Sequence, residues 1–146
     1  MLLPALLLAL LAGLLLPLQA GINSELRSSL GHPLVATLAS FLVGSVAIAL
    51  VMVGFRVSVP TGGFRNAPLW HWTGGVLGAV YVLITVVVAP RLGAATMIAT
   101  IIGGQMLASL LLDHFGVAGY VQHPVNAWRV AGAVLIIGGV VLIQRN

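Results

Sequence analysis

Polar side chains break the first apolar stretch of the chain at helical spacing. Gln19, Asn23 and Arg27 stand four residues apart in "LLPLQAGINSELRSSLG", residues 15–31, so a helix would place them on one face. An amide in hydrocarbon must find a hydrogen-bond partner, because leaving it unpaired costs several kcal/mol. The stripe therefore predicts either a contact with a neighbouring helix or a site for a polar solute. Pro17 can kink the helix beside Gln19, which suits the wall of a cavity.

A second polar stripe lies in a later apolar stretch. Gln105, Ser109 and Asp113 stand at i, i+4 and i+8, and a helix would again place them on one face. Gln105 and Ser109 are therefore candidates for the same solute site. Asp113 lies near a helix end, where it is either a solvated charge or a gate and coupling residue. Beside this stripe, Gly103 and Gly104 either allow close packing or form a hinge.

The remaining polar residues do not predict catalysis or metal binding. Asp113, His114, His123 and His71 are expected on one side of a membrane, but no pair has the i, i+4 spacing of a helical metal site. Nothing in the sequence forms a nucleophile–base pair or a phosphate-binding loop. We therefore expect no enzyme activity, no cofactor and no metal.

The composition requires that lipid surrounds the chain. Of the 146 residues, 60% are hydrophobic and 5% are charged, with a mean hydropathy of +1.18. This leaves too little polar surface to enclose an apolar core in water. The net charge of +4 comes from arginines scattered singly at the edges of apolar runs, which is typical of membrane anchoring rather than nucleic-acid binding. Residues 1–146 are predicted to form a single membrane domain.

Five apolar stretches can position the polar stripes, because a membrane-spanning helix needs about 20 residues. We expect an all-α membrane protein with transmembrane helices over roughly 2–22, 33–55, 69–89, 93–114 and 128–144. A polar turn is expected to follow the first helix as far as Leu30, and "APRLG" is expected to stop the third. Since five crossings is an odd number, the two termini are predicted to lie on opposite faces.

Long stretches of the chain resemble the half-size, five-helix YdcZ-like branch of the drug/metabolite transporter superfamily. They are "LQAGINSELRSSLGHPLVATLASFLVG", "APRLGAATMIATIIGGQMLASLLLDHFG" and "RVAGAVLIIGGVVLI". The likeness covers nearly the whole chain, and its most specific elements are Gln-x-x-x-Asn and Gly-Gly-Gln…Asp-His-Phe-Gly. The resemblance implies an exporter in a bacterial inner membrane that moves a small organic solute by alternating access.

More distantly, the chain is similar to the four-helix small multidrug resistance exporters. Gln19 takes the place of their membrane-embedded Glu, and Thr96 stands where they place an aromatic residue that clasps cations. This likeness implies that Thr96 belongs to the solute site. Because Gln19 cannot release a proton, we expect a neutral or zwitterionic solute that moves down its own gradient.

Glycines in the last helix predict how two copies meet. Gly132, Gly138 and Gly139 resemble the helix that pairs the protomers of the small exporters, so we expect a homodimer with this helix at its interface. Two opposed copies would reproduce the inverted repeats of larger transporters. The alternatives are a heterodimer with a paralogous half, or an accessory or scaffold subunit that transports nothing.

The positions of the arginines along the chain bear on how the protein is oriented in the membrane. Given five helices, they divide equally between the two faces, with Arg56, Arg65 and Arg129 on the N-terminal side, and Arg27, Arg91 and Arg145 on the other. Either a weak orienting signal lies in the N-terminal amine or the helix bounds, or the chain inserts both ways and forms an antiparallel dimer.

The equal division of arginines predicts that both orientations occur in the native membrane. Reporter domains fused after Asn146 should then be detected on both faces, because the positive-inside rule has no excess of charge to act on. A reporter found on one face alone would show a single orientation.

Overall fold

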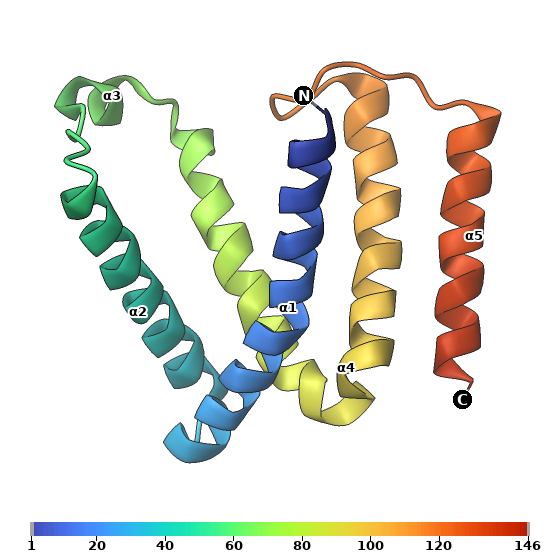
Figure 1. The fold of residues 1–146 in the computed structure, drawn as a ribbon, viewed down its shortest axis with the longest axis horizontal. Coiled ribbons are helices and arrows are strands. Elements are labelled where there is room, and N and C mark those ends of the chain that lie inside the picture. Colours follow the sequence, from blue (N-terminus) through green and yellow to red (C-terminus); the bar gives the residue numbers. More distant parts are fainter. Residues whose placement is uncertain (1, 146) are drawn as a thin grey trace. The chain divides into compact units, whose positions relative to one another are not determined.

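The chain is all-helical, as the sequence predicts. The computed structural model describes residues 2–145 and divides the chain into two compact units, Met1–Arg91 and Leu92–Asn146. All regular elements within the described residues are helices (Figure 1). In chain order they are α1 (Leu2–Leu30), α2 (Pro33–Gly54), α3 (Thr61–Asn66), the 3₁₀ helix η1 (Leu69–Trp72), α4 (Thr73–Phe115) and α5 (Ala127–Gln144). The single domain over 1–146 stays a prediction.

Helix α1 is longer than predicted. Residues 23–30, expected as a polar turn, continue the helix to Leu30. The hydroxyls of Ser28 and Ser29 donate to the carbonyls four residues earlier, at 3.3 Å each, so these polar side chains are satisfied inside the helix. The helix ends at Gly31, whose φ of 74° suits a left-handed terminating residue. Its N–H donates to the Arg27 carbonyl at 2.9 Å.

Small side chains lie where α1 and α2 pack together. The buried residues of α1 are Ala20 and Asn23, and those of α2 are Ala36 and Thr37. Residues of this size let helix backbones approach closely in lipid. The chain turns into α2 at His32, where the ring Nδ1 accepts a hydrogen bond from the Leu34 N–H at 3.2 Å.

The segment predicted as a loop between the second and third helices contains α3 and η1. The ring of Phe64 stacks on Trp72 with centroids 5.7 Å apart. The indoles of Trp70 and Trp72 are both exposed, as expected of rings that lie among lipid headgroups. The predicted third helix therefore begins with a 3₁₀ turn at Leu69 and becomes α-helical at Thr73.

A single residue divides α4 into two arms. Gly93 has φ 72° and ψ 166°, whereas the residues on either side are helical. The break predicted within "APRLG" is therefore at Gly93, and the first arm, residues 73–92, continues through Pro90. Proline keeps a helical φ and only removes one N–H, but a positive φ of this kind is accessible essentially to glycine alone. The second arm covers residues 94–115.

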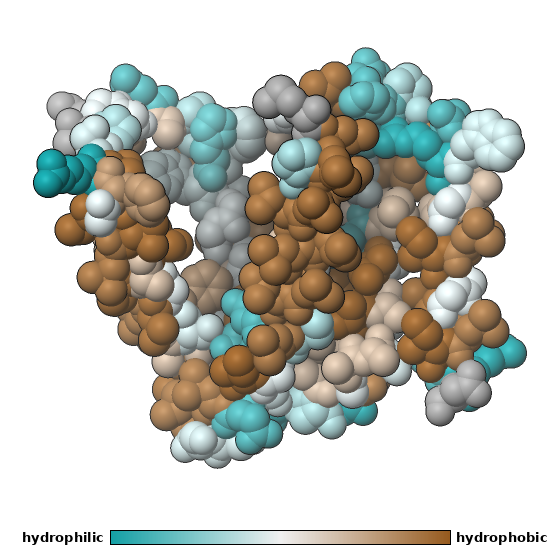
Figure 2. All heavy atoms as spheres, in the orientation of Figure 1, coloured by the Kyte–Doolittle hydropathy of each residue, from teal (hydrophilic) through white to brown (hydrophobic). Residues whose placement is uncertain are grey.

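The long helices can span a membrane. Within the described residues, α1, α2, the stretch Leu69–Phe115 and α5 are long and apolar enough for this. At 1.5 Å per residue, each arm of α4 is about 30 Å long, which matches the hydrocarbon thickness of a bilayer. Figure 2 shows hydrophobic side chains along the middle of α5 and hydrophilic ones at its ends. In the second unit, an added Cβ at Gly103 would lie 3.6 Å from Cγ2 of Val140 on α5, an ordinary packing distance.

The backbone at Gly93 predicts that Gly93→Ala destabilises the protein. A side chain at this φ and ψ is strained, which should lower the free energy of unfolding by about 1 to 3 kcal/mol, measured by thermal unfolding in detergent. Gly13→Ala in α1 is the matched control, since an added Cβ there meets nothing within 4 Å in the described residues and the backbone is already helical. Equal stability of both variants would contradict this role of Gly93.

Candidate functional site

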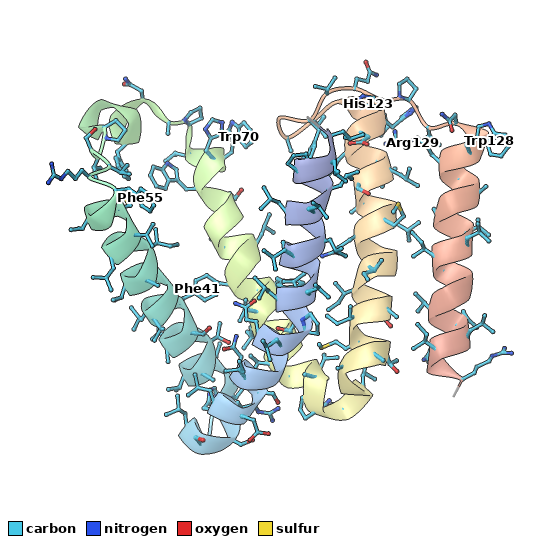
Figure 3. The ribbon with its side chains drawn as sticks, viewed as in Figure 1. Phe41, Phe55, Trp70, His123, Trp128 and Arg129 are labelled. Atoms are coloured by element: carbon cyan, nitrogen blue, oxygen red, sulfur yellow. The ribbon has the colours of Figure 1, made fainter. Side chains whose placement is uncertain are left out.

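Gln19 lines a cavity in the first unit. The cavity has a volume of about 230 Å³ and is bounded by α1, α2 and the first arm of α4. Its polar lining comes from Gln19, Ser40 and Ser45, and its apolar lining includes Phe41 and Val82. Figure 3 shows Phe41 pointing from α2 toward the first arm of α4. The cavity therefore offers hydrogen-bonding groups from two helices within an otherwise apolar wall.

One turn along α1, the amide nitrogen of Asn23 is buried and has no hydrogen-bond partner among the described residues. Only 4% of Asn23 is exposed, and its Nδ2 makes no hydrogen bond within the described residues. The buried hydroxyls of Thr37 and Thr85, by contrast, donate to carbonyls of their own helices at 2.9 and 2.8 Å. An unsatisfied buried donor costs about 1 to 3 kcal/mol. Asn23 is thus a group for which a ligand or another molecule could supply an acceptor.

A further turn along, Arg27 reaches the first arm of α4. Its Nη1 donates to the carbonyl of Val86 at 3.5 Å. In an unbroken helix that carbonyl would accept from the N–H of residue 90, but Pro90 has none. The guanidinium of Arg27 therefore supplies the donor that proline removes. Along the polar stripe predicted on α1, Gln19 lines the same cavity as Val82 of α4, and Arg27 bonds to Val86 of α4.

The other candidate site residues belong to the second unit. Thr96, Gln105 and Ser109 all lie on the second arm of α4. Gln105 is exposed, and Thr96 is half-buried. The Ser109 hydroxyl donates to the Met106 carbonyl at 3.0 Å. Ser109 also lines a separate cavity of about 360 Å³ between this arm and α5. Gln19 and Asn23 lie together in the first unit, so the assembly of all five candidates into one site stays a prediction.

Asp113 forms an ion pair with Arg129 at the start of α5. The two side chains are 22% and 31% exposed. Arg129 also donates to the carbonyl of His123 at 2.7 Å, and its backbone N–H is capped by the side chain of Asn126 at 3.0 Å. The predicted gate and coupling candidate thus holds the loop of residues 116–126 between α4 and α5.

The histidines near Asp113 are engaged with the backbone. Nδ1 of His114 accepts from the Val125 N–H at 3.2 Å, and Nδ1 of His123 lies 2.9 Å from the Val121 carbonyl. Among the described residues no three His, Asp or Glu side chains are grouped to hold a metal. The arrangement stabilises a loop.

The glycines singled out by sequence have different surroundings. Gly103 is buried, and an added Cβ there would lie 3.6 Å from Cγ2 of Val140, so the residue lies where α4 and α5 pack together; whether it serves packing or a hinge stays a prediction. An added Cβ at Gly104, Gly132, Gly138 or Gly139 would meet nothing within 4 Å in the described part of the chain. Pro17 lies inside α1 without ending it. The pronounced backbone break is at Gly93 rather than at the predicted hinge.

A known family matches almost all of this chain. The profile described as "Putative inner membrane exporter, YdcZ" covers residues 4–142. The chain belongs to the YdcZ family. No curated protein and no solved structure matches it. The resemblance stated from the sequence is therefore confirmed, and this YdcZ-family member is an integral inner membrane protein of an exporter family.

Two contacts of this YdcZ-family chain were missed by reasoning from its sequence. The Arg27 bond to Val86 joins residues that are 59 positions apart, and only the position of Pro90 four residues after Val86 signals a free carbonyl. The partner of Asp113 was also missed, although Arg129 stands three residues after the capping Asn126, in the first turn of the next helix. Ser40 and Ser45, as hydroxyls in an apolar helix, could have been proposed as cavity residues.

The ion pair predicts that Asp113→Asn loosens the loop of this YdcZ-family protein. Losing a half-exposed pair should cost about 1 to 2 kcal/mol, between the values for exposed and buried pairs, and amide hydrogen exchange over residues 116–126 should become faster. Glu25→Gln removes the same charge from an exposed position on α1 and is the control. Unchanged exchange in Asp113→Asn would show that the backbone contacts alone hold the loop.

Proposed function

We propose that this YdcZ-family protein moves a small organic solute across the inner membrane by alternating access, as an antiparallel homodimer. The observation that carries the proposal is the cavity lined by Gln19, with the unpaired amide of Asn23 one turn away on the same helix. A helix that only needed to pack in lipid would not retain an unsatisfied donor, because its cost is not recovered there.

The size and lining of the cavity support a small solute. Its 230 Å³ compares with about 30 Å³ for one water in the liquid, so several non-hydrogen atoms of a solute would fit. Gln19, Ser40 and Ser45 offer both donors and acceptors, whereas Phe41 and Val82 offer apolar contact. This combination is typical of sites for small organic molecules.

The break in α4 over residues 90–93, called the corner below, supports a mechanism that involves bending. Pro90 removes a helical hydrogen bond and Gly93 leaves the helical conformation, so the two arms are joined by a short element without a continuous hydrogen-bond ladder. Hinges in transport and catalysis consist of a few residues of this kind. In the proposed cycle the corner bends as the site opens first to one side and then to the other.

Two features support the proposed dimer, namely the glycines of α5 and the number of times that the chain would cross the membrane. Gly138 and Gly139 leave open space on α5 within the described chain, which would allow a second helix to approach closely; Gly132 lines the cavity between α5 and the second arm of α4. If each arm of α4 crosses the membrane, five crossings put the termini on opposite faces, and two opposed copies would create an inverted repeat. Gln105 of each copy would then join the site from the second unit.

The competing function is that of an accessory or scaffold subunit, or of one half of a heterodimer. An adjacent, similar reading frame with the opposite arginine bias would favour the heterodimer. A scaffold would need neither the polar cavity nor a free amide, so solute binding distinguishes it from a transporter.

Gln19→Ala is expected to abolish solute binding and transport while leaving a folded dimer. The change removes a hydrogen-bonding group from the cavity without introducing charge. A library of small organic solutes is first screened for binding to the purified protein, and uptake of the binders is then measured in proteoliposomes with and without a pH gradient. Ser28→Ala, a polar change on the exposed end of α1, is the control.

The same assay tests the coupling. Because Gln19 cannot titrate and Asp113 is paired with Arg129, uptake should follow the solute gradient alone. Proton-driven accumulation that is lost in Asp113→Asn would show that the proposed mechanism is wrong. Absence of uptake for all binders would favour the accessory subunit.

A further inference from the structure

Arg27 carries a charge that the described structure leaves without a counter-ion. Its side chain is half-buried, and its one hydrogen bond within residues 2–145 is the 3.5 Å contact with the neutral Val86 carbonyl. The ion pair formed within those residues uses Arg129 and Asp113. A guanidinium has five N–H donors and no acceptor, so most of the hydrogen-bonding capacity of Arg27 remains open to a ligand.

A second donor lies one helical turn away on the same face of α1. Asn23 stands four residues before Arg27 in this helix. Its buried Nδ2 also lacks an acceptor within the described residues. Two unsatisfied donors on one helical face, one of them positively charged, form a place that suits an oxyanion.

We propose that Arg27 and Asn23 bind the carboxylate of the transported solute. This inference rests on the proposed function and narrows it, because the solute then carries a carboxylate and is a zwitterion or an organic anion. Gln19 and the serines of the neighbouring cavity would bind its other polar groups. A lipid phosphate offers related chemistry to Arg27, but Asn23 is 4% exposed, and a headgroup outside the protein does not account for a buried donor.

The carboxylate also competes with a contact inside the protein. Charge-assisted bonds between a guanidinium and a carboxylate are shorter, at about 2.7 to 2.9 Å, and about twice as strong as bonds to neutral acceptors. A carboxylate bound by the open N–H groups of Arg27 is therefore a stronger partner than the Val86 carbonyl, which Pro90 leaves without a helical donor, and it competes with this 3.5 Å bond. Binding of the solute thus acts on a contact between α1 and the first arm of α4, four residues before Pro90.

Paired acids and amides test the proposal on the full-length protein. Acetate with acetamide, benzoate with benzamide, and alanine with alaninamide are titrated against the protein in phosphatidylcholine vesicles, and Kd is measured. Members with a carboxylate should bind and their amides should not. Arg27→Gln should weaken binding of the acids about 10- to 100-fold, and Asn23→Ala should also weaken it. Arg27→Lys, which keeps the charge, should retain part of the affinity.

Arg145→Gln removes the same charge from the exposed end of α5 and should bind the acids as the parent protein does. Equal binding of acids and amides, or failure of every acid to bind, overturns the proposal. The measurements are repeated with phosphatidylglycerol in the vesicles. If this lipid raises Tm of the parent protein but not of Arg27→Gln, and the acids have no effect, Arg27 binds a lipid phosphate and the proposal is wrong.

The two proposals fail in different ways. Gln19-dependent uptake of a solute without a carboxylate would leave the proposed transport intact and remove this inference. Absence of uptake for every solute would remove the proposed transport, whatever Arg27 binds.

Discussion

The structure depends on one constraint, which is that a polar group in hydrocarbon must be paired within the protein. Pro90 breaks this rule for the carbonyl of Val86, since it has no N–H to donate. Arg27, which is 59 residues away, restores the bond. This hydrogen bond joins α1, which carries Gln19 and Asn23, to the first arm of α4. The bonded carbonyl lies four residues before Pro90. The same contact therefore satisfies the backbone and joins the helix of the candidate site to α4 shortly before the residue where α4 leaves the helical conformation.

The second unit also pairs its polar groups within the protein, but it does so with an ion pair between side chains. The end of α4 and the start of α5 are joined by the ion pair of Asp113 with Arg129 and by bonds to loop carbonyls. The two charges neutralise each other in this pair. Asp113, on the same helical face as Gln105 and Ser109, therefore has a partner inside the second unit, and its role as a gate or coupling residue stays a prediction. The guanidinium of Arg129 is paired with the carboxylate of Asp113. The guanidinium of Arg27 bonds only to a neutral backbone carbonyl within the described residues.

Sequence reasoning found the apolar helices because their lengths and their proline and glycine boundaries are local features. It misplaced the end of α1, since the serines after Asn23 bond to their own helix instead of starting a turn. It also placed the break of α4 before Gly93, because proline is the stronger break signal in a sequence although glycine alone permits the observed φ. The stripe of Gln19, Asn23 and Arg27 followed from spacing alone. Which of them is buried, open or bonded to α4 depends on long-range packing, which spacing does not encode.

A membrane protein can retain an unpaired hydrogen-bond donor when a permanent partner inside the protein would prevent this donor from binding a ligand. Asn23 is enclosed but unsatisfied, and Arg27 is held by a long bond to a neutral carbonyl. Stronger internal partners would stabilise this state and remove the capacity to bind anything else. A contact that restores the helix backbone, yet is weaker than a bond to an ionised acceptor, can be exchanged when such an acceptor arrives. In the proposed mechanism, the long bond at Val86 would be such an exchangeable contact, and Pro90, which leaves this carbonyl without a helical donor, lies three residues before the non-helical Gly93.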